Sequence, residues 1–160
     1  MDAIGKSPVA FPVLILGKLT FICCWLFFVV KNLGVEMIYD STITRIAGVI
    51  MIVVGISILT LGITNLGKSV SVGLSREKTE LKTHGIFRLT RNPIYLGCLI
   101  ACAGSCLLAM HIINIVLFAI TLIVHHSIIL KEEEFLEKRF GEKWLEYKLA
   151  VPRYIRLAIR

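Results

Sequence analysis

The stretch that decides the fold is PIYLGCLIACAGSCLLAMHIINIVLFAITLIVHHSIIL, residues 93–130, which is almost continuously apolar. As a single helix it would be about 57 Å long, nearly twice the thickness of a bilayer core. It must therefore fold back, and its only polar interruption runs from His111 to Asn114. The stretch predicts two short membrane spans, 93–110 and 113–130, joined by a tight turn.

Two further apolar runs precede this stretch, at residues 10–31 and 45–66, and each is long enough for a membrane span. The apolar part of the first run exceeds a signal-peptide core of about 7–15 residues, so we expect a retained span. With 56% hydrophobic residues, the chain is far more apolar than a soluble domain, which has about 45–50%. We expect an all-α polytopic membrane protein of about four transmembrane helices, forming one domain over residues 1–160.

The formal net charge of +7 is better explained by membrane topology than by nucleic-acid binding. With four spans, both termini and the loop 67–92 lie on one side, which carries nearly all of the Lys and Arg residues. The positive-inside rule makes that side cytosolic, and anionic lipid headgroups attract the same residues. We therefore expect membrane lipids as partners and no nucleic acid.

After Leu130 the composition changes abruptly to KEEEFLEKRFGEKWLEYKLAVPRY. Apolar residues recur there at steps of three and four, which predicts one amphipathic helix lying along the membrane interface. An alternative is a passive anchor, with its aromatic residues at the level of the headgroups. The stripe consists of Leu136, Phe140, Trp144, Tyr147 and Val151.

The five cysteines all lie in apolar runs and form neither a CxxC pair nor a cluster with other metal ligands. Neither a disulfide framework nor a metal site is indicated. Cys98, Cys102 and Cys106 recur every fourth residue and therefore share one helix face. We interpret that face as a packing surface.

Two polar segments carry the residues that are candidates for chemistry. The segment THGIFRLTRNPIYLG, residues 83–97, places Arg88, Arg91, Asn92 and Tyr95 at the mouth of the third span, although the arginines can also be read as topology anchors. Three glutamates directly after the fourth span need cationic partners at the negative inner leaflet. The glutamates are Glu132, Glu133 and Glu134. Their partners are Arg88 and Arg91, a cationic ligand, or the local Lys131, Lys138 and Arg139.

The same two segments carry a resemblance to a known superfamily. Leu81 to Gly97 has the pattern L-x-T-x-G-x-F-R-x-T-R-N-P-x-Y-L-G, and Glu132 to Tyr147 has E-E-x-x-L-x-x-x-F-G-x-x-W-x-x-Y. With an apolar hairpin between them, the two blocks resemble the isoprenylcysteine carboxyl methyltransferase and phospholipid methyltransferase superfamily. The resemblance covers roughly the C-terminal half of the chain.

The resemblance implies that S-adenosylmethionine binds between the third and fourth spans on the cytosolic side. Leu81 would contact this cofactor mainly through its backbone, and Phe87 would supply an aromatic wall. Glu132 would bind the ammonium group of the cofactor. The pocket would be lined by Asn92, Pro93, Ile94 and Tyr95. This chemistry agrees with the residue types, because aromatic faces and carboxylates suit a cationic cofactor with a flat adenine.

The resemblance also implies methyl transfer to a lipophilic or prenylated acceptor, with a carboxyl group as first choice and a phospholipid amine as the alternative. Members that act on prenylcysteine have an arginine four residues before the first glutamate, where this chain has Ile128. His125 and His126, one turn further up, are candidate bases for a protonated nucleophile or packing residues. Two other readings are a non-catalytic membrane protein with an arginine–glutamate collar and a membrane reductase that would respond to NADPH.

Overall fold

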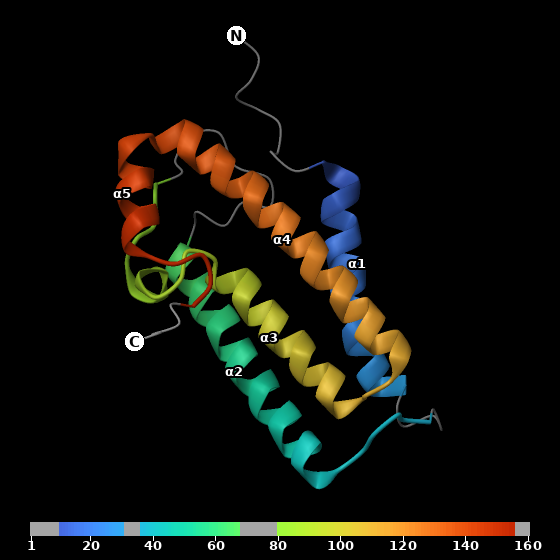
Figure 1. Cartoon of the computed structure of the whole chain (residues 1–160). Helices are drawn as coiled ribbons and strands as arrows, with labels where there is room; N and C mark the ends of the chain where they lie inside the picture. The colour runs from blue at the N-terminus through green and yellow to red at the C-terminus, as the bar shows by residue number, and fades with distance from the viewer. Residues whose placement is uncertain (1–9, 31–35, 68–79, 156–160) are drawn as a thin grey trace.

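The computed structural model describes residues 10–30, 36–67 and 80–155, and its regular structure there is helical (Figure 1). Besides helices, the described residues contain a single isolated β-bridge between Tyr39 and Met110. The helices are α1 (Phe11–Val30), α2 (Thr42–Leu66), the short 3-10 helix η3 (Gly85–Arg88), α3 (Pro93–Leu108), α4 (Ile112–Phe140) and α5 (Glu142–Ala150). The all-α expectation is confirmed.

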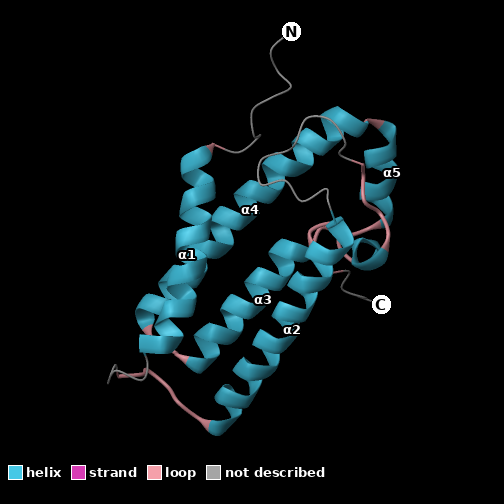
Figure 2. Ribbon diagram, turned by 180° about the vertical axis from the view of Figure 1, so that it is seen from behind, coloured by secondary structure: helices cyan, strands magenta, loops and turns pink. Residues whose placement is uncertain are grey.

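The four long helices alternate in direction and form two pairs. Figures 1 and 2 show α2 alongside α3 and α1 alongside α4, with α5 at the end where α2 ends and α3 begins. Two helices, Thr42–Leu66 and Ile112–Phe140, are long and apolar enough to cross a membrane, and two shorter apolar helices accompany them, Pro12–Cys24 and Pro93–Leu108. The termini and much of the loop 67–92, whose side of the membrane the sequence predicts, lie outside the described residues.

The predicted turn between the third and fourth apolar segments is present. Helix α3 ends at Leu108, and His111 caps α4 by accepting a hydrogen bond from the backbone N–H of Ile113 at 3.2 Å. Asn114, which is fully buried, donates to the backbone carbonyls of Ser105 and Ala109 at 3.3 and 3.1 Å. Side-chain hydrogen bonds therefore stabilise the end of the hairpin where the sequence is polar.

The tail after Leu130 does not form the one separate helix that the sequence predicts. Helix α4 continues past Leu130 through the three glutamates to Phe140, because Lys, Glu, Leu and Arg are good helix formers and no helix-breaking residue intervenes. It ends at Gly141, whose φ of +54° is accessible mainly to glycine, and α5 begins there. The single amphipathic helix predicted for the tail is thus two helices.

The apolar stripe of the tail is buried inside the protein. Trp144, Tyr147 and Val151 are 2, 7 and 8% exposed and pack with Leu81, Leu136 and Phe140. Trp144 and Tyr147 therefore pack against the protein, whereas a passive anchor would offer these rings to the headgroups. The stripe instead attaches α5 to the loop that precedes α3.

Helices α2 and α3 approach each other until their backbones touch. A Cβ atom on Gly55 would lie 2.6 Å from the backbone nitrogen of Ala101, and one on Gly97 would lie 2.6 Å from the carbonyl oxygen of Gly55. Gly48 and Gly104 face each other in the same way, at 2.8 and 2.7 Å. This confirms that the small residues of the second apolar segment are packing positions.

The other side of α3 faces α1 and α4 through side chains. Val124 and Ile128 of α4 form a buried cluster against Val13, Leu14 and Tyr95. Cys102, in the middle of the cysteine row, is fully buried, as the packing interpretation requires, whereas Cys98 and Cys106 are half-buried.

Candidate functional site

The site is built around the start of α3, where a polar loop enters the apolar hairpin. Gly85 starts η3 with a φ of +61°, and any Cβ atom there would clash with the side-chain amide of Asn65 on α2. Helix η3 holds Phe87 in a buried position, and Asn92 and Pro93 then start α3. The local sequence thus anchors this loop to α2 and α3.

Glu133 of α4 lies at the centre of a buried polar network at this mouth. Its carboxylate accepts hydrogen bonds from Arg153 at 2.8 Å, from the Asn92 side-chain amide at 3.0 Å and from Arg91 at 3.4 Å. The side chains of Glu133 and Arg91 are only 5 and 6% exposed. Burial raises the pKa of Glu133, but the Arg153 hydrogen bond, the Arg91 charge and the Asn92 hydrogen bond outweigh it, so the pKa lies below its ordinary value.

The segment after α5, which we call the C-terminal strap (residues 151–154), lies across the mouth. The backbone N–H of Arg91 donates to the carbonyl of Pro152 at 3.0 Å, and the Thr90 hydroxyl donates to the carbonyl of Arg153 at 3.0 Å. Further along the strap, Tyr154 shares a hydrogen bond of 2.8 Å with His126 of α4 and stacks on its ring. The strap therefore bridges the start of α3 and the middle of α4.

Glu132, one residue before Glu133, has a different environment. It accepts a hydrogen bond of 2.7 Å from the Tyr95 hydroxyl, its only hydrogen-bond partner among the described residues. It lies just beyond Leu130, where the apolar stretch of α4 ends. Burial raises the pKa of Glu132 above its ordinary value, and the Tyr95 hydrogen bond offsets this only in part. The carboxyl group is thus largely desolvated and has no cationic partner in the described chain.

Helical periodicity explains why neighbouring glutamates differ. At about 100° per residue, His125, Ile128 and Glu132 lie on one face of α4, which meets Tyr95. Residues 126, 130, 133 and 137 lie on a second face, roughly 140° away, which meets α5 and the strap. Glu134 lies outside both contacts and pairs with Lys131 and Lys138 at the surface, at 3.7 and 2.7 Å.

A third group of contacts joins α5 to the loop before α3. The Tyr147 hydroxyl donates to the carbonyl of Phe87 at 2.7 Å, and burial raises the pKa of Tyr147 to about 12, so it remains a donor at neutral pH. The guanidinium of Arg91 lies 5.7 Å from the ring centroid of Trp144. Two buried donors in this group, Arg91 Nε and Trp144 Nε1, have no acceptor among the described residues.

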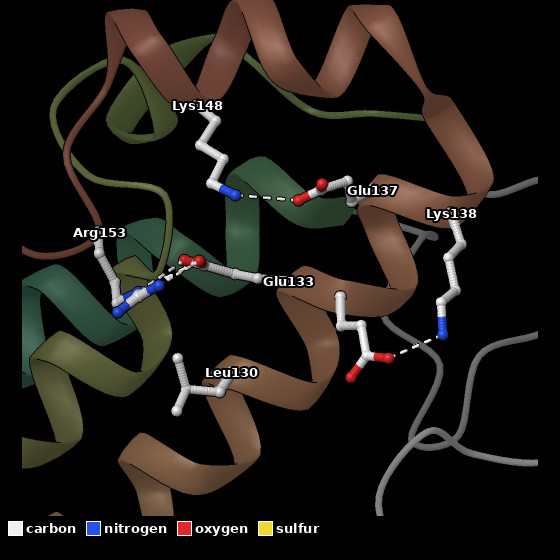
Figure 3. A pocket seen from close by; sticks show the side chains of 7 residues that line it. Leu130, Glu133, Glu137, Lys138, Lys148 and Arg153 are labelled. Carbon is white, nitrogen blue, oxygen red and sulfur yellow. Dashed lines mark hydrogen bonds and ion pairs between the residues drawn. The ribbon is translucent and has the colours of Figure 1, made fainter.

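A charged cavity of about 280 Å³, which we call the α4–α5 groove, opens on the second face of α4 (Figure 3). Lys148 reaches from α5 to Glu137 of α4, at 2.9 Å, and Arg153 closes one side through Glu133. The groove is lined by Leu130, Glu133, Glu134, Glu137, Lys138, Lys148 and Arg153.

The structure brings only some of the predicted cofactor residues together. Tyr95 and Glu132 are in direct contact, whereas Asn92 faces Glu133. Leu81 and Phe87 both lie against α5. Pro93 is buried at the start of α3, and Ile94 contacts Gly62 of α2, away from α4.

The structure also brings together only some of the other residues that the sequence singles out. Arg91 is one of the cations that Glu133 needs, whereas Arg88 is exposed and Glu134 is neutralised by local lysines as the alternative foresaw. His125 is buried, bonded to the carbonyl of Thr121 at 2.8 Å and edge-on to Tyr95. Sequence reasoning missed Arg153, although the PRY motif at the end of the tail places an arginine one residue after a proline that can turn the chain back.

Comparison with known proteins places the chain in a family. It is 35% identical to protein-S-isoprenylcysteine O-methyltransferase A of Arabidopsis thaliana over 65% of this chain and 55% of that protein. It is 28% identical to the human protein-S-isoprenylcysteine O-methyltransferase over 80% of this chain and 46% of that protein. The chain spans about half the length of the curated relatives that it matches. The sequence model of the phospholipid methyltransferase family matches residues 43–143, and the chain belongs to this family of enzymes, as its two sequence blocks predict.

Proposed function

We propose that the protein is a methyltransferase that uses S-adenosylmethionine to methylate a lipophilic acceptor at the cytosolic face of a membrane. In this proposal α1, α2, α3 and α4 each span the bilayer. Their alternating directions place the beginning of α3 and the end of α4 on one side, where the positive-inside rule puts the cytosol (Figure 1). Helix α5 and the C-terminal strap then lie at that surface.

The observation that carries the proposal is the environment of Glu132. A desolvated carboxylate without a cationic partner in the described chain is costly, and a cationic ligand would relieve that cost. The cofactor carries an ammonium group and supplies, when bound, a methyl group on a positively charged sulfur. Glu132 would bind the ammonium, and the Tyr95 hydroxyl would orient the carboxylate. Asn92 and Pro93 would shape the wall at the beginning of α3, and Ile94 would support it from the α2 side.

A second observation supports a ligand that also offers acceptors. Arg91 Nε and Trp144 Nε1 are buried donors without an acceptor among the described residues, and buried donors rarely lack a partner. The cofactor carries a carboxylate and adenine nitrogens, which are acceptors of this kind. Leu81 and Phe87 lie beside the same α5 cluster, so an aromatic wall at Phe87 is consistent with this placement.

For the acceptor, our first choice is a carboxyl group on a prenylated or similar amphiphile, as the names of the curated relatives suggest. A carboxylate nucleophile needs no base, so the chain would only position it and exclude water. The alternative is a phospholipid amine, which the family match favours. Ile128 also favours it, because this residue belongs to a buried apolar cluster with Val124 and, unlike an arginine, offers no cation for a carboxylate.

Binding measurements with the purified protein in detergent test the cofactor assignment. S-adenosylmethionine and S-adenosylhomocysteine should raise the melting temperature of the wild type. Glu132→Gln should weaken S-adenosylmethionine binding by about 1–3 kcal/mol, because a charged contact in a partly buried site is lost. Glu134→Gln removes the same charge from the exposed side of α4 and should leave the affinity unchanged. Equal affinities in the two variants would remove Glu132 from the site, and a wild type that binds neither compound would refute the enzyme proposal.

Acceptor identity needs a separate experiment. Membrane lipids and prenylated peptides incubated with the protein and methyl-labelled cofactor can be separated and analysed by mass spectrometry. A labelled methyl ester would support the carboxyl acceptor, and a labelled amine would support the phospholipid alternative. For an amine, a base must take up the proton, and His125 is the candidate on the Glu132 face of α4, edge-on to Tyr95, whereas His126 is bonded to Tyr154 on the other face.

A further inference from the structure

The α4–α5 groove lies on a different face of α4 from the proposed cofactor site. Its α4 residues, Leu130, Glu133, Glu134 and Glu137, exclude Glu132, which turns toward Tyr95. Figure 3 shows the groove bounded by α4 on one side, with Lys148 of α5 and Arg153 of the strap reaching toward it. A group bound in this groove therefore faces a different side of α4 from the Glu132 carboxyl group.

The lining of the groove is charged but balanced unevenly along its length. At the inner end, the single charge of Glu133 faces two guanidinium groups, that of Arg153 in the lining and that of the buried Arg91 outside the lining, which leaves this end positive. At the outer end, Glu137 and Glu134 are paired with lysines at the surface. Such exposed pairs add little stability, so a ligand can share or replace them at little cost. The groove thus offers a cationic end and, at the other end, two carboxylates whose lysine partners are exposed, to a ligand that carries both charges.

The groove also opens at the point where the apolar surface of α4 ends. Leu130, the last apolar residue before the charges, is 42% exposed. Val116 and Ile123 precede it at seven-residue intervals on the same face and are 49 and 63% exposed. These exposed apolar residues lead along α4 to the charged groove, an arrangement that matches an amphiphile with acyl chains below and a polar group above.

The volume limits what the groove can hold. Pockets for complete small-molecule ligands usually measure about 300–1,000 Å³ and are mostly apolar. At about 280 Å³ and with six ionisable residues in its lining, this groove suits a polar headgroup better than a whole cofactor.

We propose that the α4–α5 groove binds the headgroup of a phospholipid that carries both a phosphate and an ammonium group, as a resident lipid and not as the methyl acceptor. The phosphate lies toward Arg153 and Lys148, and the ammonium lies toward Glu137 and Glu134. The acyl chains follow the exposed apolar residues of α4. This site holds the strap and α5 against the membrane surface and does not depend on the proposed methyl transfer.

Two variants that break the same ion pair test this orientation. The purified full chain in detergent is titrated with short-chain phosphatidylethanolamine and, separately, with short-chain phosphatidylglycerol, which has the phosphate but lacks the ammonium. Lys148→Gln should weaken the binding of both lipids about fivefold, since a lysine near a phospholipid surface contributes roughly 1 kcal/mol. Glu137→Gln should weaken only phosphatidylethanolamine, so the ratio of the two affinities should fall about fivefold.

The ratio distinguishes recognition from a general effect on folding or charge. Both variants lose the Lys148–Glu137 pair, so a purely structural role of that pair would change the two lipids alike in both proteins. Lys143→Gln, at an exposed position of α5 outside the groove, is the charge-matched control and should behave as the wild type. The proposal is overturned if the wild type shows no saturable binding of phosphatidylethanolamine, or if the affinity ratio is the same in Lys148→Gln and Glu137→Gln. A protein that binds no S-adenosylmethionine can still pass this test, so the two proposals fail separately.

Discussion

Helix α3 meets α2 through backbone atoms, whereas it meets α4 through a few side chains. Along α2, glycines at positions 48, 55 and 62 leave no room for even a methyl group at the contact. On the α4 side, contact depends on Tyr95 with Glu132 and His125, and on polar groups at the two ends of the hairpin. The first interface has no space for a ligand, whereas the second is formed by side chains that a ligand could contact.

The two interfaces therefore have different roles: the α2–α3 interface supports the structure, and the α3–α4 interface carries the candidate binding residues. Close backbone packing holds α3 rigidly against α2, so the beginning of α3 is a fixed edge. Helix α4 presents two carboxylates to that edge, and each does a different task. Glu133 is fully paired and locks the strap, and Glu132 has one neutral partner and is available to a cation.

Breaking the Glu133 network should have the largest effect on stability. Glu133→Gln keeps the shape of the side chain but leaves the buried Arg91 without its carboxylate, and removing one partner of a buried pair costs about 3–5 kcal/mol. Because Arg153 is 31% exposed and partly screened, we expect the low end, about 3 kcal/mol. Thermal unfolding in detergent measures the loss. Glu134→Gln, on the exposed side, should change stability by less than about 0.5 kcal/mol.

The same glycine-to-alanine change should distinguish the two kinds of helix interface. In Gly97→Ala the new methyl group would meet backbone atoms of Gly55 and Leu59 at 2.6 Å, so α3 must move away, at a cost of about 2 kcal/mol. In Gly17→Ala on α1 the methyl group meets only side-chain atoms of α4, the nearest being Ile128 Cδ1 at 3.3 Å. Alanine also favours the helix by up to about 1 kcal/mol, so Gly17→Ala should be neutral or stabilising. Equal losses of melting temperature in the two variants would contradict the distinction between the interfaces.

The helices and the hairpin could be predicted from residues 93–130 because bilayer thickness limits the length of a span. The small residues of α2 were predictable as packing positions for a similar reason, since helices in a membrane approach closely where side chains are small. Both predictions rest on local properties of the sequence. The family resemblance likewise rests on two local blocks, and the family match confirms it.

The different roles of Glu132 and Glu133 were not predictable because the tail after Leu130 was expected to be a helix separate from the fourth span. Once α4 is known to continue to Phe140, helical phase assigns the two glutamates to different faces. The role of Arg153 depends on the break at Gly141 and on the return of the strap, both of which are tertiary features. The position of Ile94 was also not predictable from the sequence. Ile94 contacts α2, whereas Tyr95, the next residue of the same motif, contacts α4.

The smallest effect on stability is expected for Glu132→Gln. It is also the most direct test of the difference between Glu132 and Glu133, because the contributions of the two glutamates to stability should depend on pH in opposite ways. Glu132→Gln removes a desolvated charge and keeps an acceptor for Tyr95, so without ligand it should leave stability unchanged or raise it by up to about 1 kcal/mol at neutral pH. As pH falls through the raised pKa of Glu132 toward the ordinary value of 4.5, the folded wild type takes up a proton and loses its penalty, so any advantage of the variant should shrink. For Glu133 the sign is reversed, since its pKa is lowered and the stabilisation present above pH 4.5 is lost only as pH falls below that value. Unfolding of the wild type, Glu132→Gln and Glu133→Gln over a pH series measures both differences. If both variants are destabilised at neutral pH and follow the same pH dependence, Glu132 is a structural carboxylate like its neighbour, and the α3–α4 interface is not the place for a cationic cofactor.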